Sequence, residues 1–149
     1  MNKPSFKTEY VNLAQGDRMG KYLAFYFFID GIKIKMEPDA QKLFWDEEGT
    51  AIGDTESISI NDHYEINLDI KGLQEWLWEY ENQCLIPCEA GETTPEELLN
   101  IFDWKSFHEK GLAFAAQIKK LLPLCVELIY CRPFEDKSGI INSDGIVIK

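Results

Sequence analysis

The residues best suited to acid–base chemistry in this sequence are two histidines, His63 and His108. Each has an acidic neighbour, Asp62 before His63 and Glu109 after His108. A histidine held by a carboxylate can act as a general acid or base. Adjacent side chains diverge, however, and the sequence contains no nucleophile elbow, metal-type pair or glycine-rich phosphate loop. We therefore predict that the protein is not an enzyme, and a small enzyme whose site assembles only in three dimensions stays open as an alternative.

The four cysteines are the residues that could bind a soft metal ion. A structural zinc site needs two close pairs of ligands. Cys84 and Cys88 fit that spacing loosely, whereas Cys125 and Cys131 would lie roughly 20 Å apart on a strand. The chain is long enough to form a core without disulfides. We therefore expect ordinary buried or partly buried thiols, with neither a metal nor a cofactor.

Two other charged groups do not define a site. The acidic stretch 46–56 lacks the alternating acids, central glycine and terminal glutamate of a calcium loop. Arg132 could pair with Glu127 and Glu135 at the surface or belong to a site, and the sequence leaves both readings open.

The negative charge of this chain is concentrated in its middle half. The net charge is −11, and residues 37–109 alone carry −16, because nineteen acidic residues there face three lysines. Residues 1–36 and 110–149 are slightly positive. Such a block produces a field that steers cationic partners to the surface. It argues against direct binding to nucleic acid, because phosphate recognition needs the opposite sign.

Trp78 is the residue whose position is most informative about binding. In a helix from residue 73 it lies roughly 150° away from the apolar stripe and among acids. Aromatic anchors flanked by charge dominate protein–protein interfaces. The alternative is that another element, such as the 84–87 segment, packs over the indole. The predicted partner-binding residues are Trp78, Glu75, Glu79, Glu81, Asp46, Glu47, Glu48, Glu89 and Glu92.

The elements that would position these residues form an α+β domain spanning residues 1–149. Alternating and apolar runs predict a mainly antiparallel sheet built from hairpins, and apolar residues at helical spacing predict helices packed on one of its faces. Within the last helix, Gly111 lies in the buried stripe, where it would let the helix approach the sheet closely. The expected strands are 6–13, 22–29, 32–36, 58–60, 64–71 and 124–131; the expected helices are 38–46, 73–82, 95–102 and 104–122; a loop is expected at 84–94 and hairpin turns at 30–31, 61–62 and 143–145.

No apolar run is long enough to span a bilayer, and the first residues lack the apolar stretch of a secretory signal. We therefore expect a cytoplasmic protein that makes no membrane contact.

A small acidic α+β chain with aromatics among clustered carboxylates resembles the immunity proteins of bacterial toxin systems, including those of contact-dependent inhibition. The resemblance is one of character, carried by the acids around Trp78 and in the stretches 46–48 and 89–92, and it matches no family motif. It implies neutralisation of a toxin by occlusion, and many such toxins are nucleases with basic grooves. The sequence therefore predicts a binding protein for a basic protein partner. An acidic nucleic-acid mimic is the other binding alternative.

Overall fold

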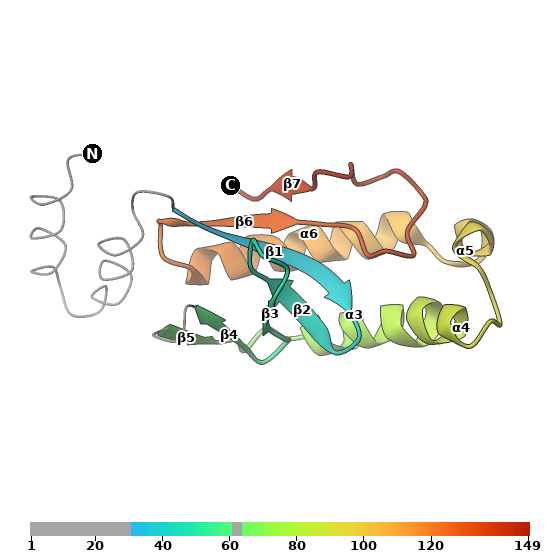
Figure 1. Ribbon diagram of the computed structural model, residues 1–149, viewed down its shortest axis with the longest axis horizontal. Helices are drawn as coiled ribbons and strands as arrows, with labels where there is room; N and C mark the ends of the chain where they lie inside the picture. Colours follow the sequence, from blue (N-terminus) through green and yellow to red (C-terminus); the bar gives the residue numbers. More distant parts are fainter. Residues whose placement is uncertain (1–30, 61–63) are drawn as a thin grey trace, which may run out of the picture.

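Residues 31–60 and 64–149, which the computed structural model describes, form an α+β fold around one mixed sheet (Figure 1). The strand order is β5-β4-β3-β2-β1-β6-β7, and every neighbouring pair is antiparallel except β1 with β6. The mainly antiparallel sheet expected from the sequence is confirmed. The strands are β1 (Ile32–Asp39), β2 (Lys42–Trp45), β3 (Ala51–Gly53), β4 (Ser57–Ile60), β5 (Tyr64–Asn67), β6 (Val126–Tyr130) and β7 (Ile146–Val147).

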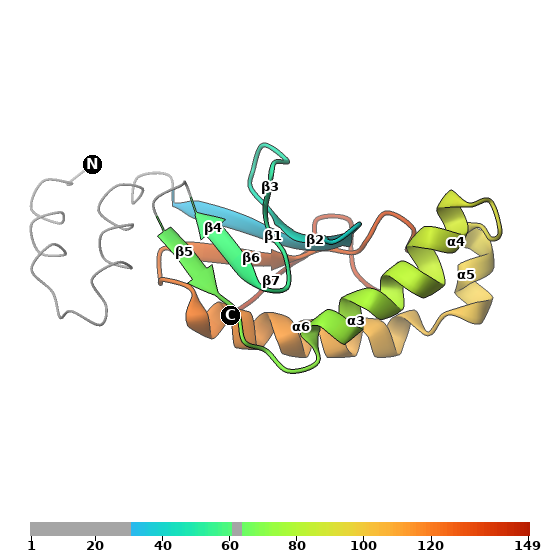
Figure 2. The same cartoon turned by 90° about the horizontal axis from the view of Figure 1, so that it is seen from below.

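The two long helical segments lie on the same face of the sheet (Figure 2). The helices are α3 (Leu73–Tyr80), the π-helical turn η2 (Glu81–Leu85), α4 (Ile86–Glu89), α5 (Pro95–Ile101) and α6 (Trp104–Leu121). Thr94 and Asp103 begin α5 and α6 as N-caps, and each side chain accepts a hydrogen bond from the backbone N–H three residues later, at 3.1 and 3.0 Å. The predicted helices 95–102 and 104–122 are confirmed within one residue.

The predicted helix over residues 38–46 is wrong, because this segment forms the β1–β2 hairpin. Met36 pairs with Phe44, both of them completely buried, and Gln41 turns the chain with a φ of 57°. Pro38 lies where the register of the two strands shifts. Irregularities of this kind are positions at which a strand tolerates a proline. Tertiary burial of Leu43 and Phe44 on the sheet therefore outweighs the local helix signal.

The prediction of a loop over 84–94 is also wrong for its first half, because the helix that begins as α3 continues through η2 and α4 to Glu89. Cys84 and Leu85 are buried, so the continuation extends the apolar side of α3. The wide turn comes just before Pro87, whose ring nitrogen cannot donate to the preceding turn. Pro87 therefore interrupts the regular α-helical hydrogen bonding without ending the helix.

Part of the core forms where α6 packs against α3 and β6. Trp76 of α3 stacks on Phe107 of α6, with ring centroids 4.5 Å apart, and its indole N–H donates to the Phe107 carbonyl at 2.9 Å. Tyr130 of β6 packs beneath Gly111, where any side chain on the glycine would overlap the tyrosine ring. The predicted close approach at Gly111 is confirmed.

Other strand predictions are confirmed in part. β4 and β5 form the expected pair, but β5 ends at Asn67, so the strand expected over 64–71 is shorter than predicted. Ile66 and Leu68 are buried, and Glu65, Asn67 and Asp69 are exposed. The turn near Gly145 is present, but it leads into β7, which pairs with β6 rather than with the preceding residues. The strands expected at 6–13 and 22–29, and the turns at 30–31 and 61–62, lie wholly or partly outside the described residues.

Candidate functional site

Trp78 lies on the outer face of α3 and is 51% exposed. The opposite face of the helix packs into the core through Leu73, Trp76, Leu77 and Tyr80. The 84–87 segment continues the helical axis and leaves the indole uncovered. An indole left half in water is uncommon, because large aromatic side chains are mostly buried. The sequence-based placement of Trp78 on the polar face is therefore confirmed.

Beside Trp78 is a recess of about 250 Å³ between α3 and the β3–β4 turn. The Thr55 hydroxyl donates to the side-chain oxygen of Gln74, which ties the turn to the helix. The Asp54 carboxylate accepts the N–H groups of Glu56 and Ser57 at 2.8 and 3.1 Å, so the turn is held by its own side chain. The lining residues are Gln41, Lys42, Asp54, Thr55, Glu56, Gln74, Leu77 and Trp78.

Two of the acids beside Trp78, Asp54 and Glu56, are residues that sequence reasoning missed. They come from a turn more than twenty positions earlier in the chain, and the only signal was its polar, turn-rich composition. Two of the predicted acids, Glu75 and Glu79, lie farther round the helix in a separate recess with Lys110 and Phe114 of α6. The carboxylates that share the recess with the indole are thus not the predicted ones.

Glu81 does not belong to an exposed acidic surface. It is only 8% exposed, and its carboxylate accepts the backbone N–H of Gln41 at 2.6 Å. Gln41 is the left-handed residue at the tip of the β1–β2 hairpin, so the carboxylate fixes that turn onto the helix. The prediction that Glu81 faces a partner is corrected, because its position on the wheel is close to Leu77 and the core.

Replacing Glu81 with alanine should lower the free energy of unfolding by about 1–2 kcal/mol, because a partly buried N–H loses its acceptor. The matched variant Glu81→Gln keeps a side-chain oxygen and should lose less. Urea denaturation of the three proteins measures both differences. Unchanged stability in Glu81→Ala would show that the hydrogen bond to Gln41 contributes nothing to the fold.

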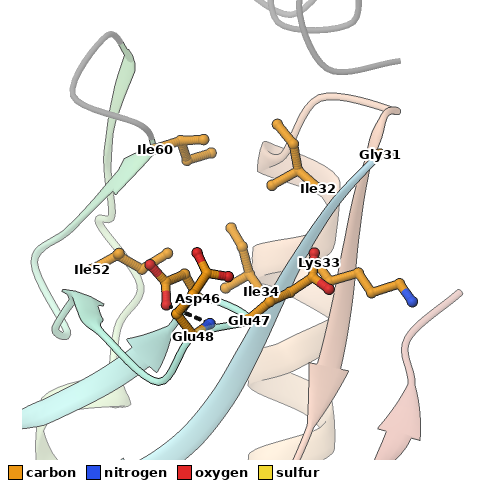
Figure 3. A pocket seen from close by; sticks show the side chains of 9 residues that line it. All are labelled: Gly31, Ile32, Lys33, Ile34, Asp46, Glu47, Glu48, Ile52 and Ile60. Atoms are coloured by element: carbon orange, nitrogen blue, oxygen red, sulfur yellow. Dashed lines mark hydrogen bonds between the residues drawn. The ribbon is translucent and has the colours of Figure 1, made fainter. Parts of the chain in front are cut away.

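The acids of the β2–β3 loop divide into one structural residue and two exposed ones. Asp46 Oδ1 accepts the N–H groups of Glu48 and Thr50 at 3.0 and 2.8 Å, which shapes the loop. Glu47 and Glu48 are exposed at its tip. All three border a second recess, lined by isoleucines, which Figure 3 shows from close by.

Glu89 and Glu92 lie at the end of α4 and just beyond it, and both are exposed. Figure 1 places α4 at one end of the molecule, away from the β2–β3 hairpin. The nine predicted residues therefore fall in three places: along α3 and the start of η2, in the β2–β3 loop, and at the end of α4. The structure does not bring them together into one patch.

His108 belongs to a buried polar network. The other members lie far from it in the sequence, so its sequence neighbours did not reveal the network. Its Nε2 lies 2.6 Å from Asp136 Oδ2, and its Nδ1 lies 2.8 Å from the Tyr130 hydroxyl. Beside it, the Tyr80 hydroxyl donates to Glu135 Oε1 at 2.5 Å. All five side chains are buried. The network fixes the residues after β6 to α3 and α6.

The electrostatics of this network favour an ionised Asp136. Burial alone raises the pKa of a carboxyl group, but hydrogen bonds from His108 and from the Ser138 N–H more than offset it, and the pKa of Asp136 lies below its ordinary value. Burial also raises the pKa of Tyr80 and of Tyr130. Both ring nitrogens of His108 are engaged and the ring is buried, so in this conformation the pair offers no free base to a substrate.

The remaining candidates for chemistry are thiols and an arginine. The four cysteines form no disulfide; two of them are buried and two partly buried, as expected for their burial. Burial raises the pKa of Cys131 to about 11, so its reactive thiolate is scarce at neutral pH. Arg132 donates to the Ile141 carbonyl at 3.4 Å, while Glu135 bonds to Tyr80 instead.

Within residues 31–60 and 64–149, no group of three potential metal ligands lies together. No helix in this part of the chain is long and apolar enough to cross a membrane.

Comparisons with protein-family models, with curated proteins and with solved structures find no match to this chain.

Proposed function

We propose that this protein binds a basic protein partner and neutralises it by occlusion, in the manner of an immunity protein against a bacterial toxin domain. The observation that carries the proposal is the half-exposed Trp78 beside a recess that also contains Asp54 and Glu56. It lies within the segment of the chain that carries a charge of −16. An anchor of this kind in an acidic field is suited to a cationic surface.

The two parts of this surface would act at different stages of binding. The acidic field raises the rate of encounter with a basic partner, and salt screens that contribution. The indole contributes after contact, when it enters a pocket of the partner and leaves water. A nuclease toxin fits this description, because its substrate groove has to be basic to hold phosphates.

The decisive experiment is capture of the partner by the immobilised full chain from a lysate of the source organism, at about 0.05 M and about 0.5 M salt. We expect a basic protein whose association slows as salt rises and whose activity is blocked by one equivalent of this chain. Failure to retain any basic protein, or retention without inhibition, would overturn the proposal. Inhibition of several unrelated nucleic-acid-binding proteins would favour the acidic mimic instead.

Replacing Trp78 with alanine should weaken binding to this partner by about 2 kcal/mol or more, which is roughly 30-fold in Kd. The free energy of unfolding should change by less than about 0.5 kcal/mol, because the indole already lies half in water. Calorimetry of the complex and urea denaturation of the free variant measure the two effects.

A matched control for Trp78→Ala is Phe134→Ala, which removes a 78% exposed aromatic from the segment after β6. Full affinity in Phe134→Ala alongside weakened binding in Trp78→Ala would place the anchor on α3. The reverse pattern, or a loss of stability in Trp78→Ala, would contradict this assignment.

A further inference from the structure

A second recess, of about 170 Å³, is lined by residues of β1, the β2–β3 loop, β3 and β4. β1 and β4 are separated in the sheet by two other strands, yet side chains from both line this one space. Figure 3 shows four isoleucines directed into it, and the side chain of Lys33 directed away from it. The partly exposed Ile32 and Ile52 form its apolar walls, and the buried Ile34 and Ile60 lie beneath them.

The rim of this recess is acidic. Asp46, Glu47 and Glu48 of the β2–β3 loop border it on one side. Asp46 Oδ1 is engaged in holding the loop, so Glu47 and Glu48 are the carboxylates at the exposed tip. The recess is therefore amphipathic, with apolar walls and an acidic rim.

The size of the recess limits what it can hold. Sites for drug-sized ligands are roughly 300–1,000 Å³, whereas an apolar cavity of about 150 Å³ holds a molecule such as benzene. A volume of about 170 Å³ therefore suits one side chain rather than a peptide or a cofactor. The residues that line the recess determine which kind of side chain it can bind.

We propose that this recess receives one lysine or arginine side chain of the basic partner. The methylene stem would pack against the partly exposed Ile32 and Ile52, above the buried Ile34 and Ile60. The cationic head would lie between the Glu47 and Glu48 carboxylates, as long cationic side chains do at apolar–polar boundaries. A purely apolar side chain would cover the carboxylates without pairing them, which costs free energy. The nature of the partner rests on the proposed function, whereas the recess itself can be tested without it.

The test uses the full chain with isoleucine δ1 methyl groups labelled for NMR, titrated with n-butylammonium. We expect the largest shifts at the partly exposed Ile32 and Ile52 methyls, with a Kd in the millimolar range, as befits so small a probe. The methyls of Ile118 in α6 and Ile141 should not move. The matched neutral probe, n-butanol, should bind at least about threefold more weakly.

The double variant Glu47→Gln/Glu48→Gln completes this test. It should bind n-butylammonium at least about threefold more weakly and leave n-butanol binding unchanged. Equal binding of both probes, or an absence of shifts at the Ile32 and Ile52 methyls, would overturn the inference.

The same variant separates this inference from the proposed function. Against a captured basic partner, the double variant should raise Kd about tenfold, independently of Trp78→Ala. A partner that is sensitive to Trp78→Ala but not to the double variant would sink the inference and leave the proposed function intact. Selective binding of n-butylammonium without any basic protein partner would support the inference and overturn the proposed function.

Discussion

Replacing Asp136 with alanine should lower the free energy of unfolding by about 3–5 kcal/mol. Asp136 is 1% exposed, and its carboxylate binds both His108 Nε2 and the Ser138 N–H, the latter at 2.8 Å. Without it, the buried imidazole loses its partner, and the segment after β6 loses its attachment to α6. A loss of this size is a large fraction of the stability of an ordinary domain.

The pH dependence of this loss has a defined sign. The pKa of Asp136 in the folded protein lies below its ordinary value of 3.8, so its contribution to stability is complete above 3.8 and is lost as the pH falls through the folded value. Burial raises the pKa of Glu37, which contributes with the opposite sign. The difference in stability between the native protein and Asp136→Ala is therefore the quantity to follow, and it should shrink below pH 3.8.

Urea denaturation from neutral pH to below 3.8 makes this measurement. Asp136→Asn is the matched control, because it keeps the size of the side chain and one acceptor oxygen but cannot ionise. It should be less destabilised than the alanine variant. A difference between native protein and Asp136→Ala that stays constant through this pH range would show that Asp136 is not an ionised partner of His108.

The parts of the fold that the sequence predicted well are those governed by local chemistry. Thr94 and Asp103 cap their helices through N–H groups only three residues away. The alternation through Ile66 and Leu68 depends only on the two-residue period of a strand. Local signals of this kind also placed Trp78 on the outer face of its helix.

The parts that the sequence missed depend on contacts between distant residues. His108 and Asp136 are 28 positions apart, Glu81 and Gln41 are 40 apart, and no local pattern announces either hydrogen bond. The segment 38–46 has a proline suited to a helix start, but pairing of its partly apolar sequence with β1 outweighs that propensity. The acids beside Trp78 were missed for the same reason, because a turn from β3 to β4 supplies them.

Gly111→Ala should lower the free energy of unfolding by about 3 kcal/mol, although alanine in a helix is ordinarily about 1 kcal/mol better than glycine. A Cβ at this position would lie 2.6 Å from Trp76 Cζ2 and 2.7 Å from Tyr130 Cζ, and would overlap the Tyr130 hydroxyl. Neither ring can move cheaply. Trp76 is stacked on Phe107 and bonded to its carbonyl, and the Tyr130 hydroxyl holds His108.

Thermal and urea denaturation of Gly111→Ala, Tyr130→Phe and the double variant test this explanation. Tyr130→Phe alone should lose about 1 kcal/mol with the hydrogen bond to His108. In the double variant the worst overlap is gone, so its loss should be smaller than the sum of the two single losses. Strict additivity, or stabilisation by Gly111→Ala, would mean that α6 shifts freely on the sheet. A helix that shifts freely would not hold His108 in register with Asp136, so the same result would also reduce the loss expected for Asp136→Ala.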